Sequence, residues 1–199
     1  MERDDDLTLR EARGLYFARA GFDASSYTAR WVRLQAGPLP LFFPNTAARV
    51  RAVRLHDLHH VVTGYDTSWT GEAEIAAWEL ASGCAGHLAA WHLNLLAMAI
   101  GLVVAPGATF RAFVRGRRSR NLYREPYGDA LLAETVGATR RRLGLVAAGA
   151  SPTAAQRAAF AATAVAALGA FLATAAPLVL ALAAAIAAAA ANAGAGPGP

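Results

Sequence analysis

Two histidines and two carboxylates have the residue types and the spacing of metal ligands. His56, Asp57 and His60 lie within one short stretch, and Glu72 follows eleven intervening residues later. If that stretch is helical, His56 and His60 share a face one turn apart, and Asp57 neighbours His60. Asp57 and His60 then point to the same side as the apolar residues of the helix, where an unpaired charge is costly.

The short loop after His60 predicts that the next helix packs antiparallel, with Glu72 facing the first helix. Two imidazoles and two carboxylates neutralise a dication, so we predict one divalent ion on His56, Asp57, His60 and Glu72. Zn²⁺ suits this set, and so do Fe²⁺, Mn²⁺ and Co²⁺. The alternative is a histidine-rich helix in which Asp57 forms a salt bridge and no ion binds.

Four further polar residues lie near this pattern. Glu79 follows Glu72 by seven residues, on the same helical face. It is a candidate for a catalytic acid or for a residue that hydrogen-bonds a metal ligand; a solvated or salt-bridged Glu79 is the alternative. His59 lies on the other side of its helix, so we interpret it as structural. His87 and His92 are five apart, a poor ligand spacing, and are expected in the core or in a substrate pocket.

Other classes of protein fit the sequence less well. The H-x-x-H-H pattern occurs in membrane desaturases, but their di-iron sites use about eight histidines and this chain has five. A phosphohydrolase of the "HD" type needs a further histidine before His56, and there is none. No glycine pattern matches a phosphate-binding loop. The arginines from Arg111 to Arg120 lack an aromatic stacking platform, so we expect a solvated or lipid-headgroup-facing surface and no nucleic acid.

Composition favours a membrane association. The chain is 55% hydrophobic and carries 19 basic residues, all arginine, against 14 acidic ones. The net charge of +5 suits an anionic membrane as well as nucleic acid, and the mean hydropathy of +0.30 favours the membrane. Cys84 is the single cysteine, which excludes an intrachain disulfide and a cysteine-based zinc site and fits a reducing compartment.

Helical periodicity and capping residues predict an all-α fold without strands. The predicted helices span residues 9–20, 27–34, 45–63, 72–82, 87–104 and 129–143, with an extended proline-rich connector at 37–44. We divide the chain into N-terminal helices and connector (1–44), a metal-binding core (45–147), a linker (148–157), a membrane helix (158–191) and a flexible tail (192–199).

Residues 158–191 contain no charge and predict a transmembrane helix, which Pro177 could kink. A low-complexity alanine tract is the alternative. Arginines precede this segment and no charge follows it, so the metal-binding core should face the cytoplasm. The acidic start of the chain does not resemble a secretory signal. We therefore expect a bacterial cytoplasmic (inner) membrane protein.

The ligand pattern, H-D-x-x-H-x11-E, resembles the signature of the coenzyme Q biosynthesis protein 4 family. The resemblance covers about residues 40–145. It also rests on flanking segments: Thr63-Gly64, Gly71, Trp78-Glu79, Tyr123-Arg124-Glu125 and Arg141-Arg142-Leu143-Gly144-Leu145. The C-terminal alanine-rich helix is not a usual feature of this family.

The resemblance implies an all-helical fold, a metal (usually zinc) on His56, Asp57, His60 and Glu72, a groove for a prenyl tail and peripheral membrane binding. The implied activity is removal of the ring carboxyl at C1 of a polyprenyl-4-hydroxybenzoate in ubiquinone synthesis, with or without coupled oxidation; another prenylated aromatic stays open. The expected partners are a prenylated aromatic lipid, the membrane and other quinone-biosynthesis enzymes, with a homodimer left open. The alternative is a non-catalytic scaffold that holds prenylated intermediates for those enzymes.

Overall fold

Helices make up most of the structure, which is a computed structural model describing residues 4–21, 24–36, 39–146 and 151–194. The predicted all-α class is confirmed. The α-helices are α1 (Leu9–Ala20), α2 (Ala47–Thr63), α3 (Trp69–Ser82), α4 (Leu88–Val104), α5 (Pro106–Gly116), α6 (Asp129–Leu132), α7 (Val136–Leu143) and α8 (Ala154–Gly194). A 3₁₀ turn, η2 (Ala24–Tyr27), and two strands, β1 (Trp31–Ala36) and β2 (Leu39–Pro44), complete the described elements.

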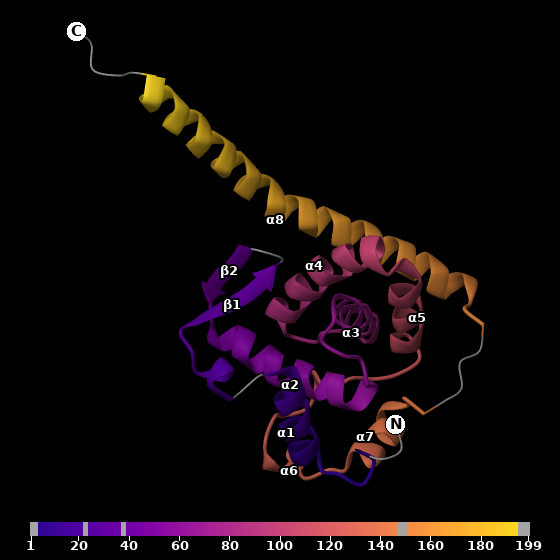
Figure 1. Cartoon of the computed structure of the whole chain (residues 1–199). Coiled ribbons are helices and arrows are strands. Elements are labelled where there is room, and N and C mark those ends of the chain that lie inside the picture. The colour runs from indigo at the N-terminus through magenta and orange to yellow at the C-terminus, as the bar shows by residue number, and fades with distance from the viewer. Residues whose placement is uncertain (1–3, 22–23, 37–38, 147–150, 195–199) are drawn as a thin grey trace.

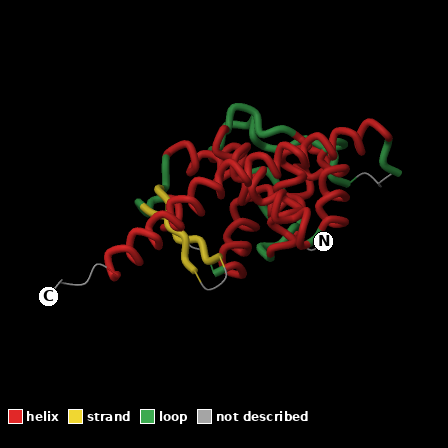
Figure 2. Tube along the Cα trace, turned by 90° about the horizontal axis from the view of Figure 1, so that it is seen from above, coloured by secondary structure: helices red, strands yellow, loops and turns green. Residues whose placement is uncertain are grey.

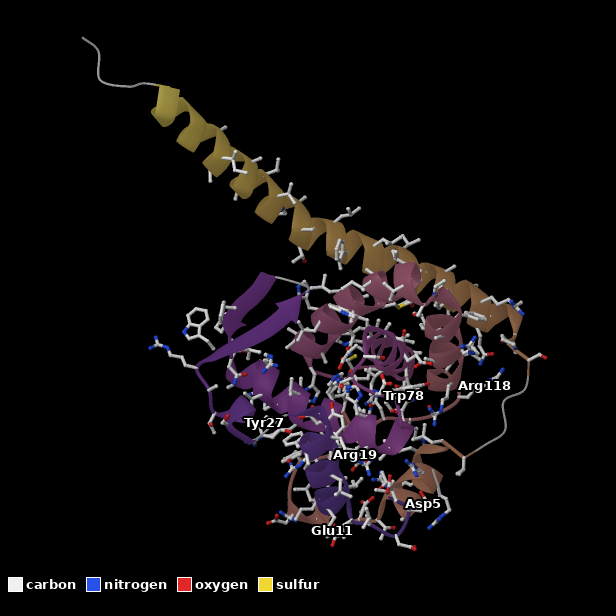
Figure 3. All side chains as sticks on the ribbon, in the orientation of Figure 1. Asp5, Glu11, Arg19, Tyr27, Trp78 and Arg118 are labelled. Carbon is white, nitrogen blue, oxygen red and sulfur yellow. The ribbon has the colours of Figure 1, made fainter. Side chains whose placement is uncertain are left out.

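Helix α3 is the centre of the core, and α2, α4 and α5 surround it (Figure 1). Two glycines permit close packing there. A Cβ on Gly101 would lie 2.5 Å from the Ala73 Cβ, and one on Gly116 would lie 2.4 Å from the Trp78 carbonyl oxygen. Trp78 itself is fully buried, in the middle of the core side chains (Figure 3). This packing fixes α3, and therefore Glu72 and Glu79, relative to its neighbours.

The prediction of a chain without strands was wrong over residues 31–36 and 39–44. β1 and β2 pair antiparallel, Trp31 with Pro44 and Ala36 with Leu39; in Figure 2 these are the strands drawn in yellow. The helix predicted over 27–34 is accordingly absent. Proline has no backbone N–H to donate, so its nitrogen must face away from the partner strand. In a two-stranded sheet both strands are edge strands, and Pro40 and Pro44, an even number of residues apart, have the same orientation. Both nitrogens can therefore face away from the partner strand.

The single helix predicted over 129–143 is also wrong, because the structure divides it into α6 and α7. Thr135 caps α7 by accepting a hydrogen bond from the Ala138 N–H. The chain between the two helices binds the N-terminal segment: Leu9 N–H donates to Glu134 O, and Val136 N–H donates to Leu7 O. This contact holds α1 against the core.

Helix α8 begins at Ala154, four residues before the predicted start, and runs along α4 and α5 (Figure 1). Its first half packs on the core, where Ala167 is fully buried. From residue 176 onward every side chain that the structure describes is exposed. Residues 154–187 are long and apolar enough to cross a membrane, by length and composition. The predicted linker and tail fall partly on residues 147–150 and 195–199, which lie outside the described residues.

Candidate metal centre

Helix α2, which carries the paired histidines, is held firmly at both ends. Thr46 caps its start by accepting from the Arg49 N–H, and Gly64 ends it in the left-handed region at φ 79°. Two arginines bind the carbonyls of its last turn: Arg115 donates to Thr63 O, and Arg140 donates to Val61 O and Val62 O. Cations suit a helix C-terminus, so the turn that contains His60 is fixed in place.

The short, hydrogen-bonded loop between α2 and α3 brings Glu72 close to His56 and His60. Ser68 caps α3, and Asp66 accepts from both the Ser68 N–H and its hydroxyl. A Cβ on Gly71 would collide with the Asp66 carbonyl, so glycine permits the close approach. The expected antiparallel packing is wrong, because Figure 1 shows α3 end-on while α2 runs across the view. The first turn of α3 nevertheless reaches α2.

Three of the four predicted ligands come together. His56 Nε2 lies 3.1 Å from His60 Nε2. The Glu72 carboxylate lies 3.7 Å from His56 Nε2 and 3.6 Å from His60 Nε2. One ligand atom from each of the three residues falls within 4.8 Å of the others. For comparison, two nitrogens at a zinc–nitrogen distance of about 2.05 Å are roughly 3.3 Å apart in a tetrahedral site.

In each histidine, the hydrogen bond made by Nδ1 determines whether Nε2 carries a proton or a lone pair. His56 Nδ1 lies 2.9 Å from a Glu79 oxygen, and His60 Nδ1 lies 2.9 Å from the Tyr65 carbonyl oxygen. Both partners are acceptors, so both Nδ1 atoms carry the proton and donate. The two Nε2 atoms then face each other with their lone pairs, an arrangement that a metal ion or one proton between them stabilises. Metal-binding histidines ordinarily donate their other N–H to a carboxylate or carbonyl, so the donor set fits a divalent ion.

Glu79 lies behind His56, in a fully buried position. One of its oxygens accepts from the Nδ1 atoms of His56 and His59, and the other accepts from the Asn94 amide at 2.5 Å and the Tyr123 hydroxyl at 2.7 Å. Burial alone would raise the pKa of Glu79, but the charge of His56 and the hydrogen bonds from both histidines hold it well below its usual range. A carboxylate with four donors orients His56 and has no proton to give.

His59 is fully buried and belongs to the same network. Its Nε2 accepts from the Leu122 N–H at 2.9 Å, and its Nδ1 donates to Glu79 at 2.6 Å. These two bonds require the neutral ring, and burial correspondingly lowers the pKa of His59. Its ring packs edge-on against Trp78 and Tyr123. His59 thus supports Glu79 and lies outside the ligand cluster.

Asp57, the fourth predicted ligand, has a different partner from the other three. Its Oδ2 accepts a hydrogen bond from the Tyr27 hydroxyl at 2.5 Å, and it lies outside the three-residue cluster found among the described residues. Burial raises the pKa of the Asp57 carboxyl, against the opposing charge of His56. A site with three protein ligands keeps a position open for water or substrate, as catalytic zinc sites do.

A proton can occupy the place of the ion. Burial alone would lower the pKa of His56, but Glu79 and Glu72 hold it well above its ordinary value. Burial, together with His56, lowers the pKa of His60 to about 4. In the metal-free protein, one proton on His56 therefore relieves the contact between the two Nε2 atoms. Metal binding has to displace that proton.

The remaining predicted residues are spread over the molecule. His87 caps α4 without a side-chain cap bond and donates to Tyr123 O, and His92 is exposed. The arginines of 111–120 do not form one surface. Arg115 binds the end of α2, and Arg118 binds Ser151 O and Gln156 at the start of α8 (Figure 3).

Sequence reasoning missed four residues of the site: Tyr16, Tyr27, Asn94 and Tyr123. The Tyr16 ring stacks on His60 with centroids 5.3 Å apart, and Tyr27 holds Asp57. Burial raises the pKa of both phenols, so they remain protonated. Two signals were available: Tyr123 stands in a segment that supports the family resemblance, and Asn94 is a polar residue inside the apolar stretch 88–104, where a buried amide needs a polar partner.

A scan against models of known protein families, a search of curated proteins and a search of solved structures each returned no match. The family that the ligand pattern resembles therefore stays a prediction.

Proposed function

We propose that this protein is a metal-dependent decarboxylase of a prenylated aromatic acid, acting at C1 of a polyprenyl-4-hydroxybenzoate-type lipid. The observation that carries the proposal is the pair of Nε2 atoms of His56 and His60, 3.1 Å apart, each backed by an acceptor on its Nδ1. Glu72 completes a three-ligand set. Zn²⁺ is the expected ion, with Fe²⁺, Mn²⁺ and Co²⁺ as alternatives.

The ion would supply Lewis acidity to a carboxylate or phenol oxygen of the bound ring. The reaction breaks the bond between C1 and the carboxyl carbon, and carbon dioxide leaves while the electron pair stays on the ring. A proton must then reach C1. Asp57, whose pKa is raised by burial, together with the Tyr27 hydroxyl, is the protonatable pair beside the ligands. We propose that this pair supplies the proton and regains it from solvent.

Apolar surfaces support a lipid substrate. Between α4 and α8 lies an apolar hollow of about 300 Å³, lined by Ala99, Ile100, Val103, Val104, Leu168 and Phe171. Val103, which is 80% exposed, and Phe171 both line this hollow, which is a surface that hydrocarbon would cover. Because a prenylated acid dissolves in the bilayer, an enzyme anchored there by α8 would meet it at high local concentration. We propose a bacterial cytoplasmic membrane location for this reason.

The alternative function is a scaffold that holds prenylated intermediates for other quinone-biosynthesis enzymes. The complete hydrogen bonding of Glu79 and His59 favours it, since such a network also suits a structural metal.

The deciding experiment measures turnover. The full chain, purified in a neutral detergent and loaded with Zn²⁺ or Fe²⁺, is incubated with a geranylated 4-hydroxybenzoate, and the decarboxylated product is measured by mass spectrometry. The enzyme hypothesis expects product from the wild type, and none from His56→Ala although that variant still binds the lipid. Lack of turnover with every metal, together with unfolding on metal removal, would favour the scaffold.

A further inference from the structure

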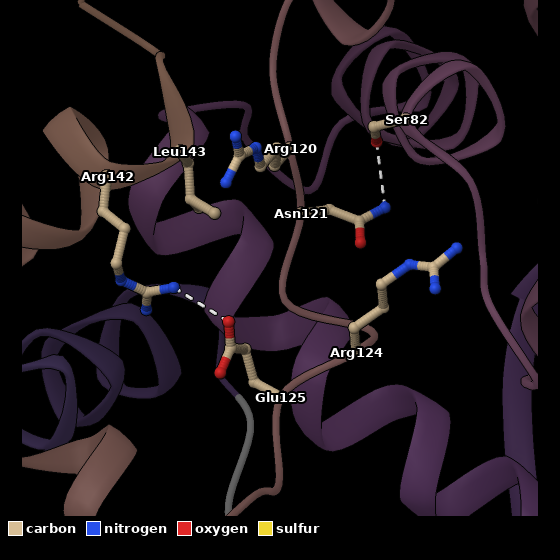
Figure 4. Close-up of a pocket in the computed structure, with 7 residues that line it drawn as sticks. All are labelled: Ser82, Arg120, Asn121, Arg124, Glu125, Arg142 and Leu143. Carbon is tan, nitrogen blue, oxygen red and sulfur yellow. Dashed lines mark hydrogen bonds and ion pairs between the residues drawn. The ribbon is translucent and has the colours of Figure 1, made fainter.

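A hollow of about 380 Å³ lies between the end of α3, the segment 120–125 and the end of α7 (Figure 4). Its charged lining consists of Arg120, Arg124, Arg142 and Glu125. The metal ligands are not part of this lining. We propose that the hollow is a binding site for a small phosphate-bearing anion, and this proposal does not rest on the proposed function.

The charges of the hollow are unbalanced. Arg142 donates to Glu125 at 2.9 Å and to Glu134 at 2.8 Å, so its charge is matched. Arg120 and Arg124 lie on either side of Asn121 and pair with no acid among the described residues (Figure 4). The three arginines therefore exceed the two glutamates by one positive charge, and the two guanidinium groups without an acid partner in the described part of the chain lie in one concave place. A phosphate monoester carries a charge of about −1.5 to −2 at neutral pH and would pair with both of these guanidinium groups.

The backbone that carries the two arginines is fixed, although it belongs to no helix or strand. Arg120 N–H donates to Leu143 O, and Leu122 N–H donates to the buried His59. The Asn121 amide donates to the Ser82 hydroxyl and to Gly83 O, and its oxygen accepts from the Tyr123 N–H. The guanidinium groups thus extend from a rigid segment, which lowers the entropy lost when a ligand is bound.

The chemistry of the lining selects the ligand. Asn121 and Ser82 use their hydrogens within the protein, so the arginines are the groups left to recognise a ligand. A guanidinium donates two parallel hydrogen bonds to phosphate or carboxylate oxygens. Two guanidinium groups without an acid partner in the described ranges can each bind anionic oxygens, which favours a phosphate dianion over a monocarboxylate. The volume exceeds that of a phosphate group and reaches the lower range of small-molecule pockets, so a small organic group fits beside it.

Calorimetric titration of the full chain in neutral detergent tests the site, after a chelator has removed metal so that phosphate cannot bind at His56 and His60. The variants are Arg120→Gln/Arg124→Gln and, as the matched control, Arg111→Gln/Arg117→Gln. Both pairs remove two exposed arginine charges. The single variant Arg124→Gln is included in case the double variant does not fold. The probes are inorganic phosphate, water-soluble dihexanoyl phosphatidic acid, and acetate as the monoanion.

We expect saturable phosphate binding in the wild type and in the control pair, at least tenfold weaker binding in Arg120→Gln/Arg124→Gln, and little binding of acetate. Tight binding of inorganic phosphate indicates a free phosphate ligand, whereas binding of phosphatidic acid alone indicates a lipid headgroup; both support the site. Absence of saturable binding of either probe to the wild type overturns the proposal. An equal loss in both double variants, which would reflect net charge only, also overturns it. Failure of the decarboxylase assay leaves this result unaffected.

Discussion

Replacing Glu79 by glutamine tests whether the carboxylate behind His56 sets the metal affinity. Glutamine keeps one acceptor oxygen, which can face the Nδ1 atoms of His56 and His59. Its NH₂ group then replaces the oxygen that accepts from Asn94 and Tyr123. Asn94 can turn its amide and Tyr123 can accept, so the hydrogen-bond network keeps its geometry. The substitution removes only the negative charge of Glu79.

The structure allows the magnitude to be worked out. A hydrogen bond to a charged group contributes about 1.5–3 kcal/mol and a neutral one about 0.5–1.5. In Glu79→Gln, the hydrogen bonds from the two imidazole N–H groups lose a charged acceptor, which destabilises the metal-free protein by about 2 kcal/mol. His56 also becomes a less basic ligand. Changes behind a metal-binding histidine typically weaken metal affinity by about 10–100-fold, and we expect a loss in that range.

The assay is competition for Zn²⁺ against a chromophoric chelator, with thermal unfolding measured with and without metal. Glu74→Gln on the same helix is the control, because Glu74 has no ion pair among the described residues. Metal affinity within about twofold of wild type in Glu79→Gln would refute the reasoning. Unchanged affinity with lost turnover would show that the Glu79 charge acts on the reaction without setting the metal affinity.

Three further perturbations have distinct expectations. Asp57→Asn should keep most of the metal affinity and lose turnover if Asp57 supplies the proton, whereas a loss of metal like that of His60→Ala would make it a fourth ligand. Gly116→Ala should destabilise the fold by about 1–3 kcal/mol in chemical denaturation, because the added Cβ meets a carbonyl. Gly14→Ala, at an open position of a helix, should instead stabilise the fold by about 0.5–1 kcal/mol. Cys84 is buried, and burial beside Glu79 raises its pKa to about 12. The thiol should therefore resist alkylation at pH 8 in the native protein and react in denaturant. Rapid alkylation of the native protein would contradict this burial.

The cluster of His56, His60 and Glu72 could be found from the sequence because the three residues lie close together along the chain. His56 and His60 lie one turn apart on one helix, and the loop to Glu72 is short, so few arrangements separate them. The direction of α3 was not predictable in this way. It depends on where Gly101 and Gly116 let α4 and α5 pack, and those contacts join residues far apart in sequence.

The partners of the ligands were predictable only in part. Glu79 shares the face of Glu72, and its helical spacing therefore placed it near the site. Tyr16 and Tyr27 reach the site from segments of no distinctive pattern. The position of Tyr16 depends on the long-range contact between the N-terminal segment and residues 134–136. Strand β1 was missed because residues 27–34 were predicted as a helix. Strand β2 was missed because its prolines discourage a strand prediction, although a two-stranded sheet tolerates them.

Helix α8 combines two roles along its length, and truncation separates them. Residues up to about 175 pack on α4 and α5, where Phe160 contacts Phe110 and Phe113. The 19 residues from 176 to 194 extend beyond that surface (Figure 1). At 1.5 Å per residue they span about 29 Å, close to the roughly 30 Å of a bilayer core. We therefore expect the distal part to carry the membrane anchor.

Ending the chain after residue 175 should release most of the protein from membranes and keep metal binding, since no ligand lies beyond Glu72. Ending it at Ser151 should also expose the apolar side of α4 and lower the melting temperature. The measurement is carbonate extraction of membranes from cells that produce each form. Complete extraction of the full-length chain would contradict a spanning helix, and α8 would then be a packed or peripheral helix.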